Sequence, residues 1–305
     1  MNLIRRLSYP LQQRLADLVY PDGTQASDFL QPSGEAALVA ADSVSWQVFA
    51  NPVAMLVGGV AAVLLELAEP RVRTGVWEHT SFRREPLTRL RRTGYAAMVT
   101  AFGARSRAER MIGQVNRGHA RIAGQTPGGV PYRADDPELL TWVHATATFG
   151  FLEAYMRCVR PLPQDQRDRY YRENVAAARL YGVACPPADE LAFQHLCERM
   201  RAQLEPSPIV AEFIDIMEGV ALLPPPARAL QRLFVRAAVQ CLPSWARQRL
   251  ALDDARWSVA PWQWSLLRAI GRAAEGLDHP RLPAVLARRR LAASPDASSI
   301  VADPR

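Results

Sequence analysis

His144 is the residue whose type and placement best suit metal or cofactor chemistry. The segment around it begins at Asp136, which suits a helix N-cap, and Pro137 suits the first helical position. Counting in threes and fours along this helix, expected to end near Cys158, places His144 on the apolar face and predicts a buried imidazole. The usual role of such a histidine is that of a core residue with one hydrogen bond. Small neighbours would equally leave a surface flat enough for a planar haem, with His144 as the iron ligand. These neighbours are Ala145, Ala147, Gly150 and Ala154.

A second histidine, His119, competes for this role. It follows a predicted helix whose apolar positions share its face, and it leads into a loop rich in glycine and proline. A hydrogen bond at the helix end is the better explanation of His119 from its spacing. His79 lies in a polar stretch near a predicted helix end, where a capping or pocket-rim residue is expected. His195 and His279 are expected at the surface.

Arg89 and Thr93 form a candidate polar wall. They lie four residues apart on a helix predicted from Pro86 to about Phe102, with Ala97 below them on the same face. Polar groups above a small residue suit the wall of a pocket. A solvated helix face rich in arginine explains the same spacing equally well.

The composition excludes several classes of enzyme. Lysine is absent from the 305 residues, so all 37 basic side chains are arginines, and 30 acidic residues leave a net charge of +7. Without lysine there is no Schiff base and no Walker or kinase lysine. Motifs for dinucleotide binding, the hydrolase elbow and zincins are also missing, as are the E-x-x-H pairs of di-iron sites, and His195-x-Cys197 is the one spacing that resembles a zinc site.

The charge and cysteine patterns describe an ordinary globular chain. Arginines are scattered among acidic residues without a nucleic-acid motif, so no nucleic-acid partner is expected. The four cysteines show no C-x-x-C spacing and are predicted to be free and mostly buried. A signal peptide is not recognisable, which favours a cytoplasmic location. Peripheral contact with a membrane and a homodimer are left open.

The pattern of apolar residues predicts an all-α fold. Apolar residues recur at spacings of three and four, and prolines divide the chain into about ten helices. The run from Val53 to Leu65 is shorter than the ~20 residues of a membrane span and is predicted to be a buried core helix closed by Glu66. We expect an N-terminal arm (1–40), one multi-helix domain (41–275) and a C-terminal extension (276–305). The extension should end in a disordered tail from Ser294.

Several segments form an ordered pattern that resembles a known family. They are Ser43 to Trp46, Pro52 with the apolar 56–65 segment, Pro70, Gly75 to His79, Arg89 to Thr93 with Phe102, His119 with Gly124, and Tyr132 to Thr146. Together they resemble the MpaB-like oxygenase family, which includes the catalytic domain of the rubber oxygenases known as latex clearing proteins. The resemblance covers roughly residues 40 to 270. Its most specific piece runs from Asp136 to Thr146.

The resemblance implies a haem enzyme with a globin-like helical core around a buried haem pocket. By similarity His144 is the proximal ligand of haem b, and His119 and Arg89 are further cofactor-binding candidates. An Arg-x-x-Lys-Thr group on the distal helix of the rubber oxygenases matches Arg89, Arg92 and Thr93, which are thus the catalytic candidates. Arg92 replaces the lysine. Because arginine stays protonated, Arg92 cannot bind iron as a neutral amine can, but it could bind a propionate, a superoxide or an acidic substrate group.

The resemblance implies an oxygenase more firmly than it implies a substrate. It predicts O2 and an apolar, unsaturated, isoprenoid- or lipid-like molecule as reactants, with Arg89 and Thr93 on the distal side. The distal glutamate of the rubber enzymes does not align uniquely with Glu66, Glu69 or Glu78. Two alternatives stay open: a haem-binding protein without oxygenase activity, and a haem-free helical lipid-binding protein.

Overall fold

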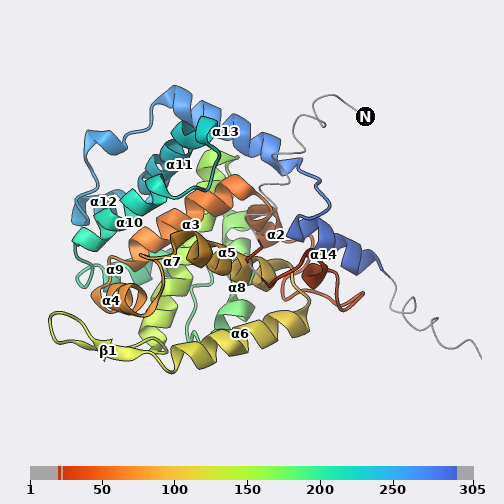
Figure 1. Cartoon of the computed structure of the whole chain (residues 1–305), viewed down its shortest axis with the longest axis horizontal. Helices are drawn as coiled ribbons and strands as arrows, with labels where there is room; N and C mark the ends of the chain where they lie inside the picture. The colour runs from red at the N-terminus through yellow and green to blue at the C-terminus, as the bar shows by residue number, and fades with distance from the viewer. Residues whose placement is uncertain (1–19, 22, 294–305) are drawn as a thin grey trace, which may run out of the picture.

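The structure, a computed structural model, describes residues 20–21 and 23–293. The tail predicted from Ser294 and the first half of the predicted N-terminal arm lie outside these residues. The helices are η1 (Ala26–Phe29), α2 (Val44–Phe49), α3 (Pro52–Glu66), α4 (Pro70–His79), α5 (Pro86–Phe102), α6 (Arg105–His119), α7 (Pro137–Cys158), α8 (Gln164–Leu180), α9 (Glu190–Met200), α10 (Pro208–Gly219), η2 (Pro225–Ala227), α11 (Arg228–Cys241), α12 (Ser244–Arg249), η3 (Ala255–Trp257), α13 (Pro261–Glu275) and α14 (Pro283–Ala292). The fold is thus mostly helical, as predicted (Figure 1).

A short hairpin interrupts the helices where the sequence predicted only a loop. Strands β1 (Ala123–Gln125) and β2 (Pro131–Arg133) pair antiparallel, with Gly124 opposite Tyr132. Gly129 has a φ of 78°, which is strained for other residues and lets the chain turn back. The Tyr132 side chain is buried and anchors the hairpin.

Helices α3 and α7 form the central pair of the fold. Asn51 and Asp136 cap them with side-chain oxygens, and a proline follows each cap. The two backbones meet at glycines: a Cβ on Gly58 would lie 2.6 Å from the Cα of Phe151, and one on Gly150 would lie 2.6 Å from the Gly58 carbonyl oxygen. These glycines therefore permit the close crossing that positions every residue of the two helices.

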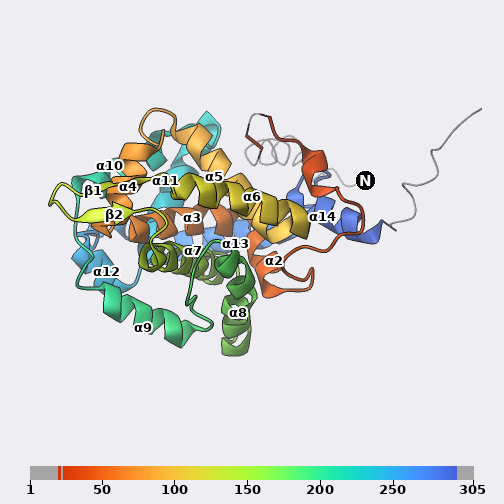
Figure 2. The same ribbon diagram turned by 90° about the horizontal axis from the view of Figure 1, so that it is seen from below.

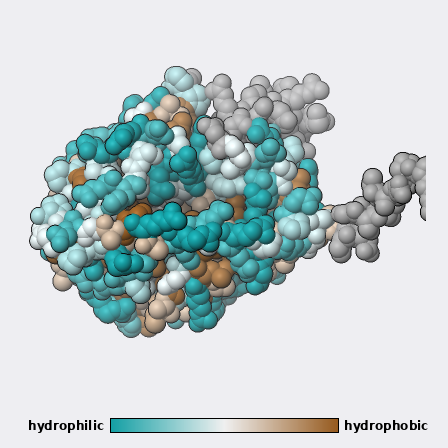
Figure 3. All heavy atoms as spheres, turned by 60° about the horizontal axis from the view of Figure 1, so that its bottom comes forward, coloured by the Kyte–Doolittle hydropathy of each residue, from teal (hydrophilic) through white to brown (hydrophobic). Residues whose placement is uncertain are grey.

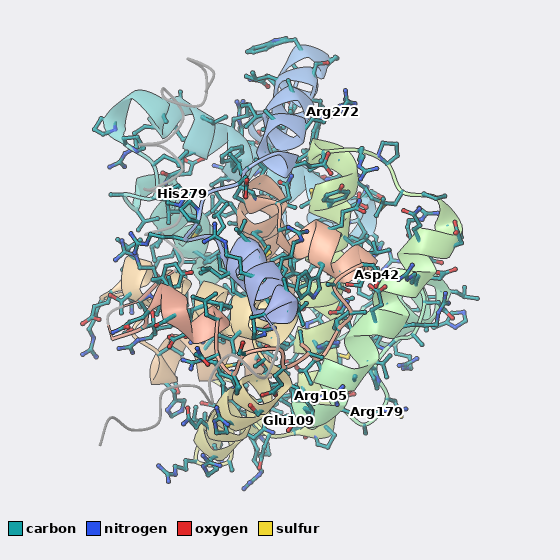
Figure 4. The ribbon with its side chains drawn as sticks, turned by 90° about the vertical axis from the view of Figure 1, so that its right-hand side faces the viewer. Asp42, Arg105, Glu109, Arg179, Arg272 and His279 are labelled. Atoms are coloured by element: carbon teal, nitrogen blue, oxygen red, sulfur yellow. The ribbon has the colours of Figure 1, made fainter. Side chains whose placement is uncertain are left out.

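Other helices cover the central pair on different sides. Helices α11 and α13 pack against both α3 and α7. Helices α5 and α6 pack against each other and run across the other side of the pair, where α5 also meets α2 and α14 and α6 meets α8 (Figure 2). Figure 4 shows Arg105 and Glu109 at the start of α6 near Arg179 of α8.

The C-terminal helix holds the described part of the N-terminal arm. Arg290 of α14 is buried and donates from Nε to the Glu35 carbonyl and from Nη1 to the Phe29 carbonyl, each at 2.8 Å. His279, predicted at the surface, is 2% exposed, so that prediction was wrong. Its carbonyl accepts from the Leu282 N–H and its Nδ1 accepts from the Arg281 N–H, which ties it into the turn before α14.

The cysteine prediction is confirmed for the described chain: Cys158, Cys197 and Cys241 are free and buried, and Cys185 is free and exposed. Within residues 20–21 and 23–293, no single helix has the length and apolarity to cross a membrane. Helices α3 and α4 reach that length together, but they are bent by 113°.

Candidate functional site

The candidate site lies where the α5–α6 pair faces the α3–α7 pair. Contacts between the backbones of the α5–α6 pair and the α3–α7 pair are sparse compared with those inside each pair. Side chains on the facing surfaces are accordingly only partly buried. They include Leu56, Val63 and Glu66 of α3, Arg89 of α5, His119 of α6, and His144, Ala147 and Phe151 of α7. On the face of the molecule that carries α6, hydrophobic surface shows between the hydrophilic side chains (Figure 3).

Glu66, the last residue of α3, is the most perturbed acid of this region. Burial raises the pKa of its carboxyl from 4.5 to about 7, although the Arg89 guanidinium and the Thr146 hydroxyl act in the opposite direction. The Thr146 hydroxyl also lies 3.0 Å from the carbonyl oxygens of Trp142 and Val143, so its one proton is shared among acceptors. Glu66 is therefore a largely desolvated carboxyl that keeps part of its surface accessible. At neutral pH it can both accept and donate a proton.

The charge of Arg89 acts on both Glu66 and His119. Burial lowers the pKa of the Arg89 guanidinium, the Glu66 carboxyl opposes this shift, and Arg92 adds to it. The same guanidinium helps to lower the pKa of His119. Arg92 and Thr93 keep exposed side chains. The structure therefore brings Arg89 close to Glu66 and His119. The distal roles of Arg92 and Thr93 stay predictions.

His144 is a neutral imidazole in apolar surroundings. Burial lowers its pKa from 6.5 to about 4. Its Nε2 lies 3.3 Å from the Thr148 hydroxyl, which itself donates to the His144 carbonyl at 2.9 Å. The flat surface expected beside it is smaller than predicted, because Gly150 packs against Gly58 and only Ala147 of the small neighbours is partly exposed.

His119, the last residue of α6, has a buried nitrogen with an unmet hydrogen bond. Burial lowers the pKa of its imidazole, Arg89 lowers it further, and Asp135 opposes both. Its Nδ1 is buried and finds no hydrogen-bond partner within the described residues. The hydrogen bond predicted at this helix end is thus not made by Nδ1. An unpaired buried nitrogen costs ~1–3 kcal/mol, so Nδ1 needs a partner, which an ordered water or a bound ligand can supply.

The other candidates from the sequence lie elsewhere. Glu69 caps α4 and pairs with Arg71 at 2.6 Å. Glu78 and His79 are exposed near the Tyr132 hydroxyl, at 3.5 and 3.1 Å respectively. Among the three glutamates left open by the sequence, Glu66 is therefore the one beside Arg89. The signal in the sequence was its position as the charged residue that closes an otherwise apolar helix.

His119 and His144 are the candidate cofactor ligands of this region. No cluster of three or more histidine, cysteine or carboxylate side chains that could hold a metal ion occurs in the part of the chain that the structure describes. A haem iron requires only one side chain from the protein. Two neutral imidazoles, His119 and His144, are present on α6 and α7.

Comparisons with known proteins agree with the motifs. Residues 46–275 match the family model described as "ER-bound oxygenase mpaB/B'/Rubber oxygenase, catalytic domain". The chain is also similar to uncharacterized protein Mb2261 of Mycobacterium bovis and uncharacterized protein Rv2237 of Mycobacterium tuberculosis. Each is 27% identical over 225 residues, which are 70% of this chain and 87% of the relative. No solved structure matches the chain.

Proposed function

The chain belongs to the family of the ER-bound oxygenase mpaB and rubber oxygenase catalytic domains, and from this premise we propose that it is a haem b-dependent oxygenase. Its substrates are O2 and an apolar, unsaturated, isoprenoid- or lipid-like molecule. The observation that carries the proposal is Glu66, a desolvated carboxyl of pKa about 7 beside Arg89 at the end of a mostly apolar helix. Such a group is suited to proton transfer next to an apolar substrate.

The residues present fit a haem. The orphaned Nδ1 of His119 and the neutral imidazole of His144 lie on helices α6 and α7, where the α5–α6 pair faces the α3–α7 pair. We assign His144 as the proximal iron ligand. His119 is the second candidate because its buried nitrogen lacks a partner, and Arg89 is suited to a haem propionate. When bound, haem supplies an iron that activates O2.

The protein's own groups then have distinct roles. Glu66 accepts or donates a proton at its carboxyl, and Arg89 stabilises the carboxylate that results. Thr93 is the proposed hydrogen-bond donor on the distal side. Leu56 and Val63, on the partly exposed face of α3, exclude water and contact the apolar substrate.

Absorption spectra of the purified protein test the proposal, with a pyridine haemochrome assay after expression with a haem precursor. We expect a Soret band in the wild type that His144→Ala abolishes and His119→Ala weakens. The reverse pattern would assign the iron to His119. A colourless wild type that haemin cannot reconstitute would overturn the oxygenase and favour a haem-free lipid-binding protein. A haem protein that consumes no O2 with unsaturated isoprenoids or lipids would be a carrier or sensor.

A further inference from the structure

The outward face of α13 is almost without charge. The helix packs against α3 and α7 through its buried residues Leu267, Gly271 and Ala274. Its exposed positions are Pro261, Trp262, Ser265, Leu266, Ala269, Arg272, Ala273 and Glu275. A helix on the surface of a globular protein ordinarily presents charged and polar side chains to water. This face instead offers mostly small and apolar residues, with Arg272 and, at the C-terminal end of the helix, Glu275.

Two side chains make the α13 face an apolar patch. Trp262 is 65% exposed and Leu266 is 41% exposed. They lie four residues apart and are therefore neighbours on the helix surface. Adjacent large apolar side chains on one exposed face mark an interaction site, unlike apolar residues scattered singly. Helix α13 lies along the upper edge of the molecule in Figure 1, away from α6 at the lower edge.

Guanidinium groups border the patch. Arg268 and Arg272 lie along α13 and bond through Nε to the carbonyls of Trp264 and Val159, at 3.3 and 3.2 Å. Arg157 of α7 lies over the Trp264 ring, 5.9 Å from its centroid, and its charge is paired with the Glu153 carboxylate. Figure 4 shows Arg272 at the outer end of the molecule.

Two carboxylates close in sequence to α13 or at its end bond to other groups. Asp254 accepts the Arg256 N–H at 2.7 Å and so caps η3. Glu275 accepts from the Tyr155 hydroxyl and, at 3.3 Å, from Arg160. Within the described residues Arg268 and Arg272 form no ion pair with a carboxylate, so these two arginines give the border of the patch its positive charge.

We propose that this α13 face docks on the surface of an anionic phospholipid bilayer. Tryptophan and leucine enter the boundary between headgroups and acyl chains, while Arg268 and Arg272 keep their guanidinium groups at the phosphates. A second copy of the chain fits less well, because a two-fold interface would bring the same arginines together. The docking is independent of the proposed oxygenase activity, since α13 contributes none of the residues of the candidate site.

Sedimentation with vesicles tests the docking. Wild-type protein is mixed with vesicles of phosphatidylcholine alone or of phosphatidylcholine with phosphatidylglycerol. We expect binding to the anionic vesicles that weakens as salt is added. The double variant Trp262→Ser/Leu266→Ser should lose on the order of ten-fold in partitioning, because two apolar side chains no longer enter the membrane. The matched control is Leu191→Ser on α9, where the leucine is 59% exposed, and it should bind like the wild type.

A spectroscopic signal from the same face is a second measurement. Tryptophan fluorescence of the wild type should shift to shorter wavelength on anionic vesicles, and Trp262→Phe should lose part of this shift while it still binds. Unchanged binding of the double variant, or equal wild-type binding to both kinds of vesicle, would overturn the proposal. So would a lipid-free dimer that the double variant converts to a monomer, because the face would then join two copies.

Discussion

The buried carboxylate of Glu66 lowers the free energy of unfolding, and this effect can be measured without a substrate. Its pKa is about 7 in the folded protein against 4.5 ordinarily, so its contribution to stability is complete below pH 4.5 and is lost as the pH rises through 7. The shift corresponds to at most about 3 kcal/mol. We therefore expect Glu66→Gln to stabilise the protein at pH 8 by up to this amount and to have little effect at pH 4.5. Urea unfolding at both values is the measurement, and an equal effect at both would contradict it.

Single residues were predicted unevenly by the sequence. Spacing correctly placed His144 on a helix that faces the interior, because the helical repeat fixes which residues share a side. It could not distinguish Glu66 from Glu69 and Glu78, because their environments depend on residues far away in the chain. Arg89 lies 23 positions after Glu66 and Thr146 lies 80 positions after it, and both affect its pKa.

The helices themselves were predictable where caps and prolines are local signals. The predicted helices from Pro137 to Cys158 and from Pro86 to Phe102 are confirmed, as is the buried helix that Glu66 closes. The hairpin at β1 and β2 was missed, because three-residue strands carry too few residues for a period-two pattern. The crossing of α3 and α7 at Gly58 and Gly150 was also invisible in the sequence, since it pairs residues from distant segments.

This crossing predicts a sharp difference between two adjacent glycines of α3. Gly58→Ala would place a Cβ 2.6 Å from the Phe151 backbone, so the helices must separate, and we expect a loss of ~1–3 kcal/mol or more. Gly59→Ala is the matched control, because its Cβ would meet the nearest atom at 3.7 Å. Alanine there should be neutral or stabilise the helix by up to about 1 kcal/mol. Thermal unfolding compares the two, and similar melting temperatures would mean that the helices do not cross as described.

For the whole molecule, His144 and Glu66 give pH dependences of opposite sign. The pKa of His144 is lowered from 6.5 to about 4 in the fold, so its contribution is complete above pH 6.5 and is lost as the pH falls through 4. Between pH 4.5 and 6.5 the contribution of Glu66 falls with rising pH while that of His144 grows, and the two slopes oppose each other. The wild type therefore hides both effects in this range, and single variants should reveal them.

His144→Gln removes the pH-dependent contribution of the histidine to the free energy of unfolding and leaves that of Glu66. Unfolding free energies of the haem-free protein, measured from pH 4.5 to 6.5, should then fall with rising pH in His144→Gln and rise with pH in Glu66→Gln. Each difference from the wild type across this range should reach about 2 kcal/mol, since a pKa shift of one unit is worth ~1.4 kcal/mol. The double variant lacks both contributions, so its unfolding free energy should change with pH as that of the wild type does. Parallel curves for all four proteins would show that neither side chain is desolvated, and the region between the α5–α6 and α3–α7 pairs would then be open to water.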